Sequence, residues 1–548
     1  MVSEKSPCER LTGENMKKIL GIAAFIFALG TSVFAQNVQI RKMGSTNSAS
    51  EILSNGKSKY VSVFAINDFH GSVEEDLAGK NPGAAKLYEV VSELKAVNPE
   101  SIFVSAGDNY QGSALSNLSG GKVVSDFFNY ADLAVSTIGN HEFDWGEEKF
   151  AEWEKDGNFN FIACNLVYKK DGKKPEWLKD YELYNIGGHL ICVIGTATVD
   201  TIYTASKNKI EDFEFLDPAK SVRKVLRKVD ALYHPEAVIV LSHIGSHDNR
   251  LFKGNPVSAD ESTELEDLCR IKGIDAVITG HSHEYVNGLV NGVPVVQAIN
   301  YGRAISQIKL KFNNDGLVSA KGSVIEVYKE KDSITENADV LSLVASYKTK
   351  YGAQLGETIA FVEEELSHEE NVPNVTPLGY VIASAMKAAF KTDFAVTNGG
   401  GLRKSINAGT LTVNDMWELI PFDNTGVIAT VSGATLKKIV DHGINTAGFR
   451  AGQFAGGTVY YTTQKPEGSR VTKIVLDDGR TVEDSETYTV VVNDFMAEGG
   501  DKYDVIATEA KSLENTYIPF RDAVSDVLKS WGTISKTYAQ MPKVLVAQ

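Results

Sequence analysis

Two short motifs, SAGDNYQGS (residues 105–113) and GNHEFD (residues 139–144), decide the fold of this 548-residue chain. Each motif directly follows a short apolar run. Short apolar runs that are bounded by glycine and polar residues are typical of buried strands. We therefore expect both motifs at strand ends, where Asp108, Asn140 and His141 would lie together at one edge of a sheet.

The same pattern of strand, turn and helix recurs along the first part of the chain. Apolar runs predict strands at 60–66, 102–106, 134–138, 159–164, 190–195, 237–241, 275–279, 293–299 and 305–312. Helical spacing of apolar residues lies between several of them, at 84–97, 124–130, 218–232 and 265–271. This alternation predicts an α/β layer fold in which helices cover a sheet and ligands bind beyond the strand ends.

The chain is too long for one hydrophobic core, so two domains or more are expected. Residues 313–336 are polar and rich in turn formers, and residues 340–351 have the apolar spacing of one amphipathic helix. We interpret that helix as a connector. The predicted organisation is a first domain over 59–330, a linker over 331–356 and a second domain over 357–548 with both helices and strands.

The N-terminus has the organisation of a secretory signal peptide. A basic pair is followed by a short apolar run and by small residues up to Ala35. We expect residues 1–35 to be removed by cleavage after Ala35, with residues 1–15 preceding a more natural start at Met16, and residues 36–58 to form a leader. No other apolar run is long enough to span a membrane. A periplasmic or secreted location follows.

Charge and cysteine content exclude two classes of protein. A net charge of −16 argues against a broad nucleic-acid surface, so an anionic substrate would need local cations. Beyond the signal peptide the cysteines are Cys164, Cys192 and Cys269, an odd number that makes no disulfide framework. We expect buried thiols, with a disulfide between Cys164 and Cys192 as the alternative. Monomer and dimer are equally compatible with the sequence.

Donor side chains that suit divalent metal ions recur at the predicted strand ends. They are Asp68 with His70, Asp108, Asn140, His243, and His281 with His283. With His141, which follows Asn140, five of the ten histidines of the chain lie in these motifs, which a random scatter would not produce. A carboxylate between two such sets, such as Asp108, can bridge two metal ions. Two divalent ions clamp the attacking and leaving oxygens of an in-line displacement at phosphorus.

His141 and Asp144 form a separate feature of the GNHEFD motif. An aspartate three residues after a histidine can orient the ring and keep it cationic. Such a histidine can protonate a leaving group or stabilise the oxygens of the transition state. The alternative is that Asp144 caps the helical stretch that follows and that His141 is structural.

A known family of enzymes shares a series of motifs with this chain: NDFHG, GDNYQGS, GNHEFD, SHIGS and GHSH. In their order these motifs resemble those of the calcineurin-like metallophosphoesterases. In their residues they resemble the 5′-nucleotidase family, whose bacterial members include periplasmic UDP-sugar hydrolases. The resemblance covers about residues 58–540. It implies an α/β metallophosphoesterase domain of the four-layer α/β/β/α sandwich type, followed by a smaller α+β substrate-binding domain.

The resemblance also implies roles for the strand-end donors. It assigns one metal ion to Asp68, His70, Asp108 and His283, and the other to Asp108, Asn140, His243 and His281. His141 and Asp144 would form the catalytic dyad. The expected cofactors are two divalent ions, which could be zinc, manganese, magnesium or cobalt.

Three stretches of the second domain resemble substrate-binding positions of the family: TNGGGLR (397–403), IPFDN (420–424) and NDFMAEGGDKYD (493–504). The resemblance implies that two phenylalanines stack on a nucleobase, that an aspartate accepts hydrogen bonds from ribose and that an arginine and an asparagine hold phosphate or ribose oxygens. These residues are Phe422, Phe495, Asp501, Arg403 and Asn398. The alternative is that both rings pack in a core and that the glycine-rich stretches are ordinary turns.

One position departs from the family. Members usually open the first helix of the second domain with an arginine that precedes a Gly-Asn pair, but here Pro377 stands in that place and Tyr380 replaces the asparagine. Either another cation substitutes, with Arg450 and Lys404 as candidates, or the hold on phosphate is weaker.

The predicted function is hydrolysis of nucleoside monophosphates to nucleoside and phosphate outside the cytoplasm, in nucleotide salvage. The enzyme alternatives are a 2′,3′-cyclic nucleotide phosphodiesterase and a UDP-sugar or nucleotide pyrophosphatase. The alternative of another class is a catalytically silent surface-binding protein. No nucleic acid partner and no membrane span are expected.

Overall fold

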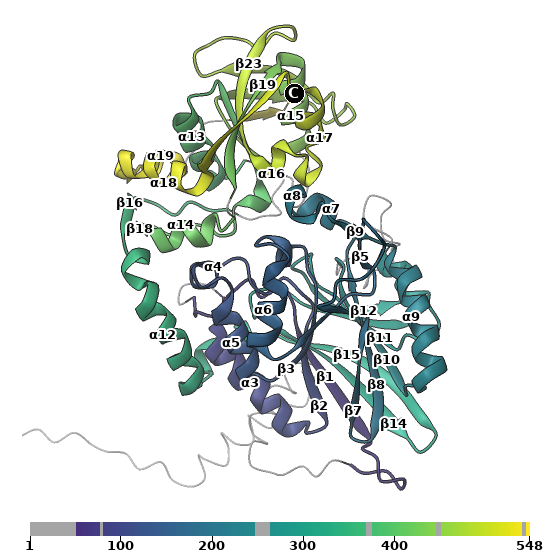
Figure 1. The fold of residues 1–548 in the computed structure, drawn as a ribbon. Helices are drawn as coiled ribbons and strands as arrows, with labels where there is room; N and C mark the ends of the chain where they lie inside the picture. The colour runs from purple at the N-terminus through teal and green to yellow at the C-terminus, as the bar shows by residue number, and fades with distance from the viewer. Residues whose placement is uncertain are drawn as a thin grey trace, which may run out of the picture.

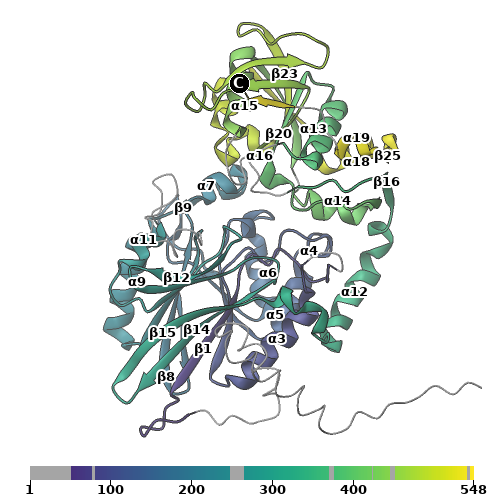
Figure 2. The same ribbon diagram turned by 180° about the vertical axis from the view of Figure 1, so that it is seen from behind.

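The computed structural model describes residues 51–76, 80–246, 264–368, 375–422, 424–444, 451–539 and 544–547. These residues form two folded parts that one long helix connects along their side (Figures 1 and 2). The predicted signal peptide, most of the predicted leader and Arg450 lie outside the described residues.

The first part contains two large sheets. In sheet order, the strands of the seven-stranded sheet are β15 (Gly316–Ile325), β14 (Ile305–Asn313), β1 (Tyr60–Ile66), β2 (Ser101–Ser105), β3 (Leu133–Thr137), β4 (Asn160–Ile162) and β6 (Leu178–Lys179). Those of the six-stranded sheet are β12 (Tyr285–Val290), β13 (Val293–Ala298), β11 (Ala276–Ile278), β10 (Ala237–His243), β8 (His189–Ala197) and β7 (Tyr181–Ile186). The neighbours β1 and β2 run parallel, as do β10 and β11, so the carboxyl ends within each pair meet at one edge.

The two sheets pack face to face and helices cover both outer faces. Apolar residues of the two inner faces, among them Val63, Val104, Val193 and Ile239, form one buried cluster between the sheets. The outer face of the first sheet is covered by α3 (Gly83–Val97), α5 (Lys122–Tyr130) and α6 (Glu148–Gly157), and that of the second by α9 (Pro218–Tyr233) and α11 (Glu264–Cys269). The predicted four-layer α/β/β/α sandwich is confirmed.

Helix α9 shows how the sequence sets these outer layers. The Asp217 side chain accepts a hydrogen bond from the Lys220 backbone N–H and Pro218 occupies the first turn, a combination that favours a helix start. Val222, Val225 and Val229 then recur on one face and are buried against the second sheet.

Strand β15 was not predicted, because residues 313–336 are polar and turn-forming. It pairs antiparallel with β14 over almost its whole length, and most of its side chains are half-exposed or exposed. A strand at a sheet edge is held by its neighbour's backbone and carries little apolar periodicity of its own, so the sequence pattern did not reveal it.

The predicted connector is α12 (Ala338–Leu355). The Asn337 side chain caps its start by accepting from the backbone N–H groups of Asp339 and Val340. Val340 and Val344 are buried in the core of the first part, and the Tyr347 hydroxyl donates to Asp126 at 2.6 Å. The helix is therefore packed on the first part and delivers the chain to the second.

The second part is an α+β fold, as predicted. Its central sheet has the order β20 (Gly452–Ala455), β17 (Phe394–Asn398), β23 (Thr487–Asn493), β19 (Thr425–Ser432) and β24 (Ser512–Pro519). One face packs on α13 (Pro377–Phe390) and α18 (Phe520–Trp531), and the other on α15 (Gly433–Gly443). Its smaller sheets join β16 (Thr358–Val362), β18 (Gly409–Thr412) and β25 (Thr533–Ile534), and β21 (Gly457–Tyr461), β22 (Val471–Leu476) and β26 (Leu545–Ala547).

Two further expectations concern thiols and membrane spans. Cys164, Cys192 and Cys269 are all buried and free, so the alternative of a disulfide between the first two is wrong. Among the described residues, no helix combines the length and the apolar character needed to cross a bilayer.

Candidate active site

The five motifs meet at one edge of the two sheets. Asp68 and His70 follow β1, Asp108 follows β2, and Asn140 follows β3. On the other sheet His243 ends β10, whereas His281 and His283 follow β11. Five of these seven residues have left-handed backbones, with φ of 49° at Asp68 and His70, 53° at Asp108, 75° at His281 and 56° at His283. Such backbones are costly away from glycine and concentrate at functional sites, where they turn the chain sharply.

The structure brings six of the predicted ligands into two clusters, within each of which the ligand atoms lie within 4.8 Å of one another. The members are Asp68, His70 and His283 in the first cluster, and Asp108, His243 and His281 in the second. The predicted seventh ligand, Asn140, joins the second cluster because its Oδ1 lies 3.0 Å from His281 Nδ1. Asp108 Oδ2 lies 3.1 Å from His243 Nε2 and 4.0 Å from His70 Nε2, so this carboxylate stands between the two clusters.

The ring nitrogens of two histidines test whether divalent ions fit. His243 Nδ1 donates to the Ala106 carbonyl at 2.7 Å, and His70 Nδ1 donates to the Gln111 carbonyl at 2.8 Å. Because a carbonyl only accepts, each ring directs Nε2 into its cluster. His243 Nε2 is buried without a hydrogen bond, and His70 Nε2 faces His283 Nε2 at 3.1 Å. Backbone carbonyls that orient histidines in this way are a hallmark of metal sites, and the donor set fits two divalent ions.

Burial and mutual interactions shift the pKa values in this cluster. Burial, with the nearby Arg403 guanidinium, holds the pKa of His70 well below its ordinary value, and burial with His243 lowers the pKa of His281 to about 3. Burial raises the pKa of Asp108, but His243 and His141 outweigh burial and hold that pKa well below its ordinary value, so the carboxyl is ionised. For His243 burial is outweighed by Asp108, which raises the pKa to about 10, so a metal ion would compete with that proton.

His141 and Asp144 are in direct contact. His141 Nδ1 lies 2.9 Å from Asp144 Oδ2, and the His141 backbone N–H donates to Asp108 Oδ1 at 2.8 Å. Burial lowers the pKa of His141, but the Asp144 and Asp108 carboxylates raise it above its ordinary value overall. Helix α6 begins at Glu148 without a side-chain cap, so this geometry favours the dyad over the capping alternative.

Sequence reasoning missed Glu142, which joins the two central motifs. Its fully buried carboxylate accepts from the backbone N–H groups of Asp108 at 2.9 Å, Asn109 at 2.6 Å and Gly139 at 2.7 Å. Burial and the Asp108 charge raise the pKa of Glu142 to about 7. The sequence did contain a signal for this role, because Glu142 is an acidic residue inside the GNHEFD motif, which is otherwise expected to be buried.

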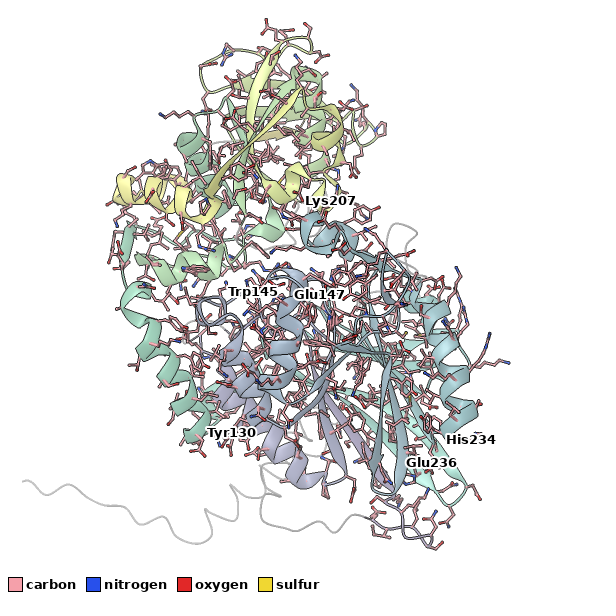
Figure 3. The ribbon with its side chains drawn as sticks, in the orientation of Figure 1. Tyr130, Trp145, Glu147, Lys207, His234 and Glu236 are labelled. Atoms are coloured by element: carbon pink, nitrogen blue, oxygen red, sulfur yellow. The ribbon has the colours of Figure 1, made fainter. Side chains whose placement is uncertain are left out.

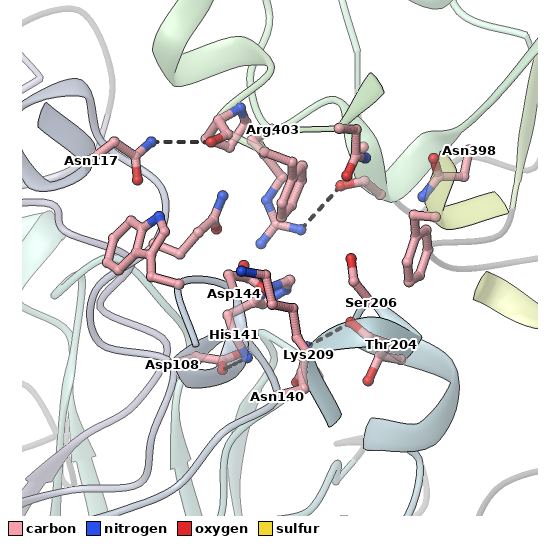
Figure 4. Close-up of a pocket in the computed structure, with 18 of the residues that line it drawn as sticks. Asp108, Asn117, Asn140, His141, Asp144, Thr204, Ser206, Lys209, Asn398 and Arg403 are labelled. Carbon is pink, nitrogen blue, oxygen red and sulfur yellow. Dashed lines mark hydrogen bonds and ion pairs between the residues drawn. The ribbon is translucent and has the colours of Figure 1, made fainter. Parts of the chain in front are cut away.

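The clusters open into a cleft of about 530 Å³ that both parts of the molecule line (Figure 4). All five substrate residues predicted in the second domain line it: Asn398, Arg403, Phe422, Phe495 and Asp501. Both phenylalanines thus face the cleft rather than a closed core. Gln111, which also lines the cleft, lies inside the SAGDNYQGS motif, although no role was predicted for it. The sequence patterns gave no signal for several other lining residues of the first domain, because these come from helices and loops outside the quoted motifs: Asn117, Trp145, Lys149, Thr204, Ser206, Asn208 and Lys209.

The second domain reaches the metal-ligand clusters through two of these residues. Arg403 Nη2 lies 3.4 Å from His70 Nε2, and its Nη1 donates to the Gly400 carbonyl at 3.2 Å. The Phe422 ring lies 5.3 Å from the His141 ring and 5.9 Å from the Arg403 guanidinium. Deeper in the second domain, Asn398 Nδ2 donates to Asp501 Oδ2 at 2.6 Å.

Pro377, which stands where the family usually has an arginine, starts a helix and does not line the cleft. Pro377 occupies the first turn of α13 behind the Thr376 cap, and neither Pro377 nor Tyr380 is among the residues that line the cleft. Lys404 is not among the lining residues either, and its Nζ lies 3.2 Å from Asp415 and 2.5 Å from Glu418.

The paired donor clusters at the edge of a four-layer sandwich define the class of metal-dependent phosphoester hydrolases. The family model of the calcineurin-like phosphoesterase matches residues 61–285, and that of the 5′-nucleotidase C-terminal domain matches residues 356–508. The chain belongs to the family of calcineurin-like phosphoesterases that carry this C-terminal domain.

Three similar proteins support this assignment. The chain is 28% identical to Endonuclease YhcR of Bacillus subtilis over 82% of its own length, but spans only 38% of that protein. It is 25% identical to a 5′-nucleotidase of Vibrio cholerae, over 86% of this chain and 91% of that protein. Among solved structures, a 5′-nucleotidase precursor from Thermus thermophilus matches with a TM-score of 0.77 and 25% identity, over 89% of this chain and 99% of that chain.

Proposed function

We propose that this protein hydrolyses nucleoside monophosphates to nucleoside and phosphate outside the cytoplasm. The observation that carries the proposal is that one cleft joins the two metal-ligand clusters to Arg403, Phe422 and Phe495. A phosphoryl group at the clusters would lie next to a guanidinium and two aromatic rings, which suits a phosphate ester of a planar base.

The two clusters support an assignment of the metal ligands. Asp68, His70, Asp108 and His283 would hold one divalent ion, and Asp108, Asn140, His243 and His281 the other. When bound, the two ions supply Lewis-acid neutralisation of the charge on the phosphoryl oxygens. Mixed imidazole and oxygen donors suit zinc, manganese or cobalt better than magnesium, which prefers oxygen and water.

The protein's own groups handle the proton and the orientation. With Asp144 on Nδ1, the His141 ring holds a proton at Nε2 and donates it to the 5′-oxygen of the leaving nucleoside. Arg403 donates to the phosphoryl oxygens and fixes their orientation. Phe422 and Phe495 hold the base by stacking, and Asp501 accepts hydrogen bonds from the ribose hydroxyls.

A location outside the cytoplasm is supported by the basic, apolar and small-residue order that ends at Ala35. In that location, removing the phosphate serves salvage, because a neutral nucleoside passes through carriers more readily than its charged phosphate.

Assays of AMP, a 2′,3′-cyclic nucleotide and a UDP-sugar with the same purified protein in Mn²⁺ and in Zn²⁺ test the proposal. We expect the highest kcat/KM for AMP. A higher kcat/KM for the cyclic nucleotide or the UDP-sugar would assign the chain to a diesterase or a pyrophosphatase. Loss of all three activities in protein that retains two metal ions per chain would favour a silent binding protein.

A further inference from the structure

His368 is a buried histidine of the second domain that belongs to neither metal-ligand cluster. It is 5% exposed and follows a short antiparallel bridge between Leu366 and Ile406. Its Nε2 donates to the Gly399 carbonyl at 3.0 Å, and its Nδ1 lies 2.8 Å from Thr376 Oγ1. Both ring nitrogens therefore have a specific partner, as buried polar groups require.

His368 holds both ends of the loop that carries Arg403. At the first end, its ring donates to the Gly399 carbonyl. At the second end, Ser405 Oγ accepts from the His368 backbone N–H at 2.9 Å and donates to the His368 carbonyl at 3.0 Å. Three hydrogen bonds to one residue thus enclose the loop 399–405, and Arg403 lies between them.

The position of the Arg403 guanidinium depends on this loop. Arg403 points into the cleft, where its Nη1 donates to the Gly400 carbonyl at 3.2 Å and its Nη2 lies 3.4 Å from His70 Nε2 (Figure 4). The loop turns through the three glycines 399–401, which have no side chains to hold the turn by packing. The Arg403 backbone N–H adds one bond of its own, to the Leu419 carbonyl at 2.9 Å.

The second ring nitrogen connects His368 to the start of α13. Thr376 Oγ1 caps this helix by accepting from the Gly379 backbone N–H at 3.0 Å, and Gln453 Oε1 accepts from the Thr376 backbone N–H at 2.9 Å. His368, Thr376 and Gln453 are at most 6% exposed. The start of α13 is therefore a fixed support for His368, and through it for the loop of Arg403.

We propose that His368 is a positioning residue that fixes the loop 399–405, so that the Arg403 guanidinium is already in place to bind the phosphoryl group of a nucleotide. This inference rests on the proposed function and deepens it. His368 is not among the residues that line the cleft, so it acts through Arg403 and not on the substrate. A loop that is ordered before binding does not have to be ordered by the substrate, and affinity rises accordingly.

Kinetics of AMP and of an aryl phosphate, measured for His368→Leu in the full chain with its metal ions, test the proposal. We expect kcat/KM for AMP to fall about three- to tenfold, mostly through a higher KM, because Arg403 is present but less well placed. The aryl phosphate, which does not enter the second domain, should lose less than about twofold. His368→Gln keeps an N–H donor for the Gly399 carbonyl and should restore most of the AMP activity.

A double variant separates positioning from a general structural role. If His368 acts only through Arg403, adding His368→Leu to an Arg403→Ala chain should lower kcat/KM for AMP by less than about twofold further. A further loss as large as the one in the wild-type background would overturn the proposal. Equal losses of AMP and aryl phosphate activity in His368→Leu would also overturn it.

Ser405→Ala and hydrogen exchange keep the proposal testable if His368→Leu folds poorly. Ser405→Ala removes the other hold on the loop without changing the buried ring, so AMP activity should fall in the same pattern but less. In either variant the backbone amides of 399–405 should exchange about tenfold faster than in wild type. Unchanged exchange would overturn the proposal. Exchange needs no substrate, so it still decides the role of His368 if the wild type hydrolyses no AMP and the proposed function fails.

His189→Leu is the matched control in the first domain. His189 is also fully buried, and its Nε2 donates to the Ser58 carbonyl at 2.7 Å while its Nδ1 lies 3.0 Å from Glu236. Figure 3 shows Glu236 at the end of the first domain that points away from the second. His189→Leu should lower the melting temperature but leave kcat/KM for AMP within about twofold. A loss of AMP activity equal to that of His368→Leu would overturn the proposal, because loss of any buried histidine would then have the same effect.

Discussion

The two domains contribute to the cleft in different ways. In the first domain the proposed metal ligands Asp68, His70, Asp108 and His243 are at most 2% exposed, and three of the four have left-handed backbones. In the second domain Arg403, Phe422, Phe495 and Asp501 are half-buried, and only Asp501 has a left-handed backbone, with φ of 51°.

We interpret this difference in burial and backbone conformation as a division of roles, with the chemistry in the first domain and substrate selection in the second. Donors that converge on one ion must be fixed within a fraction of an ångström, so they sit on short turns whose strain the surrounding core holds in place. Residues that select a substrate sit on half-buried surfaces that complete the site only where the two domains meet. We therefore expect substitutions in the first domain to affect all substrates, and those in the second to affect only substrates that reach it.

The largest effect is expected for Asp108→Ala, because this carboxylate lies between the two clusters. The turnover number should fall by about a thousandfold or more for every substrate, and bound metal measured by atomic emission should fall below two ions per chain. If an Asp108→Ala chain kept two tightly bound ions, the bridging position would be wrong and the contrast between the domains would lose its main support.

His141→Ala should act on the rate without acting on the metal. Because the His141 ring is assigned to proton transfer and not to coordination, kcat should fall by roughly 10²- to 10⁴-fold while metal content stays near two ions per chain. Asp144→Asn should show a smaller loss of the same kind. Loss of one ion from the His141→Ala chain would instead make His141 a ligand.

Glu142→Gln tests whether the buried Glu142 carboxylate is needed to hold the two loops of the first-domain site in place. Three backbone N–H groups now donate hydrogen bonds to this carboxylate. The amide of glutamine would place its own N–H donors against one of them, so that hydrogen bond would be lost. We expect metal affinity or kcat to fall by roughly 10- to 100-fold, the usual cost of losing a group that orients metal ligands. Equal metal affinity and equal kcat would show that the two loops hold their shape without this carboxylate.

The contrast also explains what the sequence could predict. Metal donors follow strands directly, so NDFHG, GDNYQGS, GNHEFD, SHIGS and GHSH marked both the strand ends and the six residues that the structure gathers into clusters. Lys209, Trp145 and Asn117 come from separate helices and loops, and no local pattern shows that they share a cleft. Strand β15 was missed for a similar reason, because its partner β14 and not its own periodicity defines it.

Arg403→Ala tests the expectation that a substitution in the second domain affects only substrates that reach that domain. Because we propose that the guanidinium orients the phosphate of a bound nucleotide, kcat/KM for AMP should fall at least about tenfold. The loss should be much smaller for an aryl phosphate, which binds at the clusters without entering the second domain. Equal losses on both substrates would indicate that Arg403 is structural, through its bond to the Gly400 carbonyl.

The smallest effect is expected for Pro377→Arg, which restores the arginine usual in the family. From the sequence alone, this change should improve nucleotide hydrolysis or leave it unchanged. In the structure Pro377 sits in the first turn of α13, outside the lining of the cleft, so kcat/KM for AMP should stay within about twofold. Losing a proline that is preorganised for a helix start should lower the free energy of unfolding by roughly 0.4–1 kcal/mol, measurable by urea denaturation. A tenfold gain in kcat/KM would mean that the start of α13 reaches the phosphate in solution, and a tenfold loss would mean that the new side chain crowds the cleft. Either result would give the second domain a direct part in the chemistry and remove the division of labour between the domains.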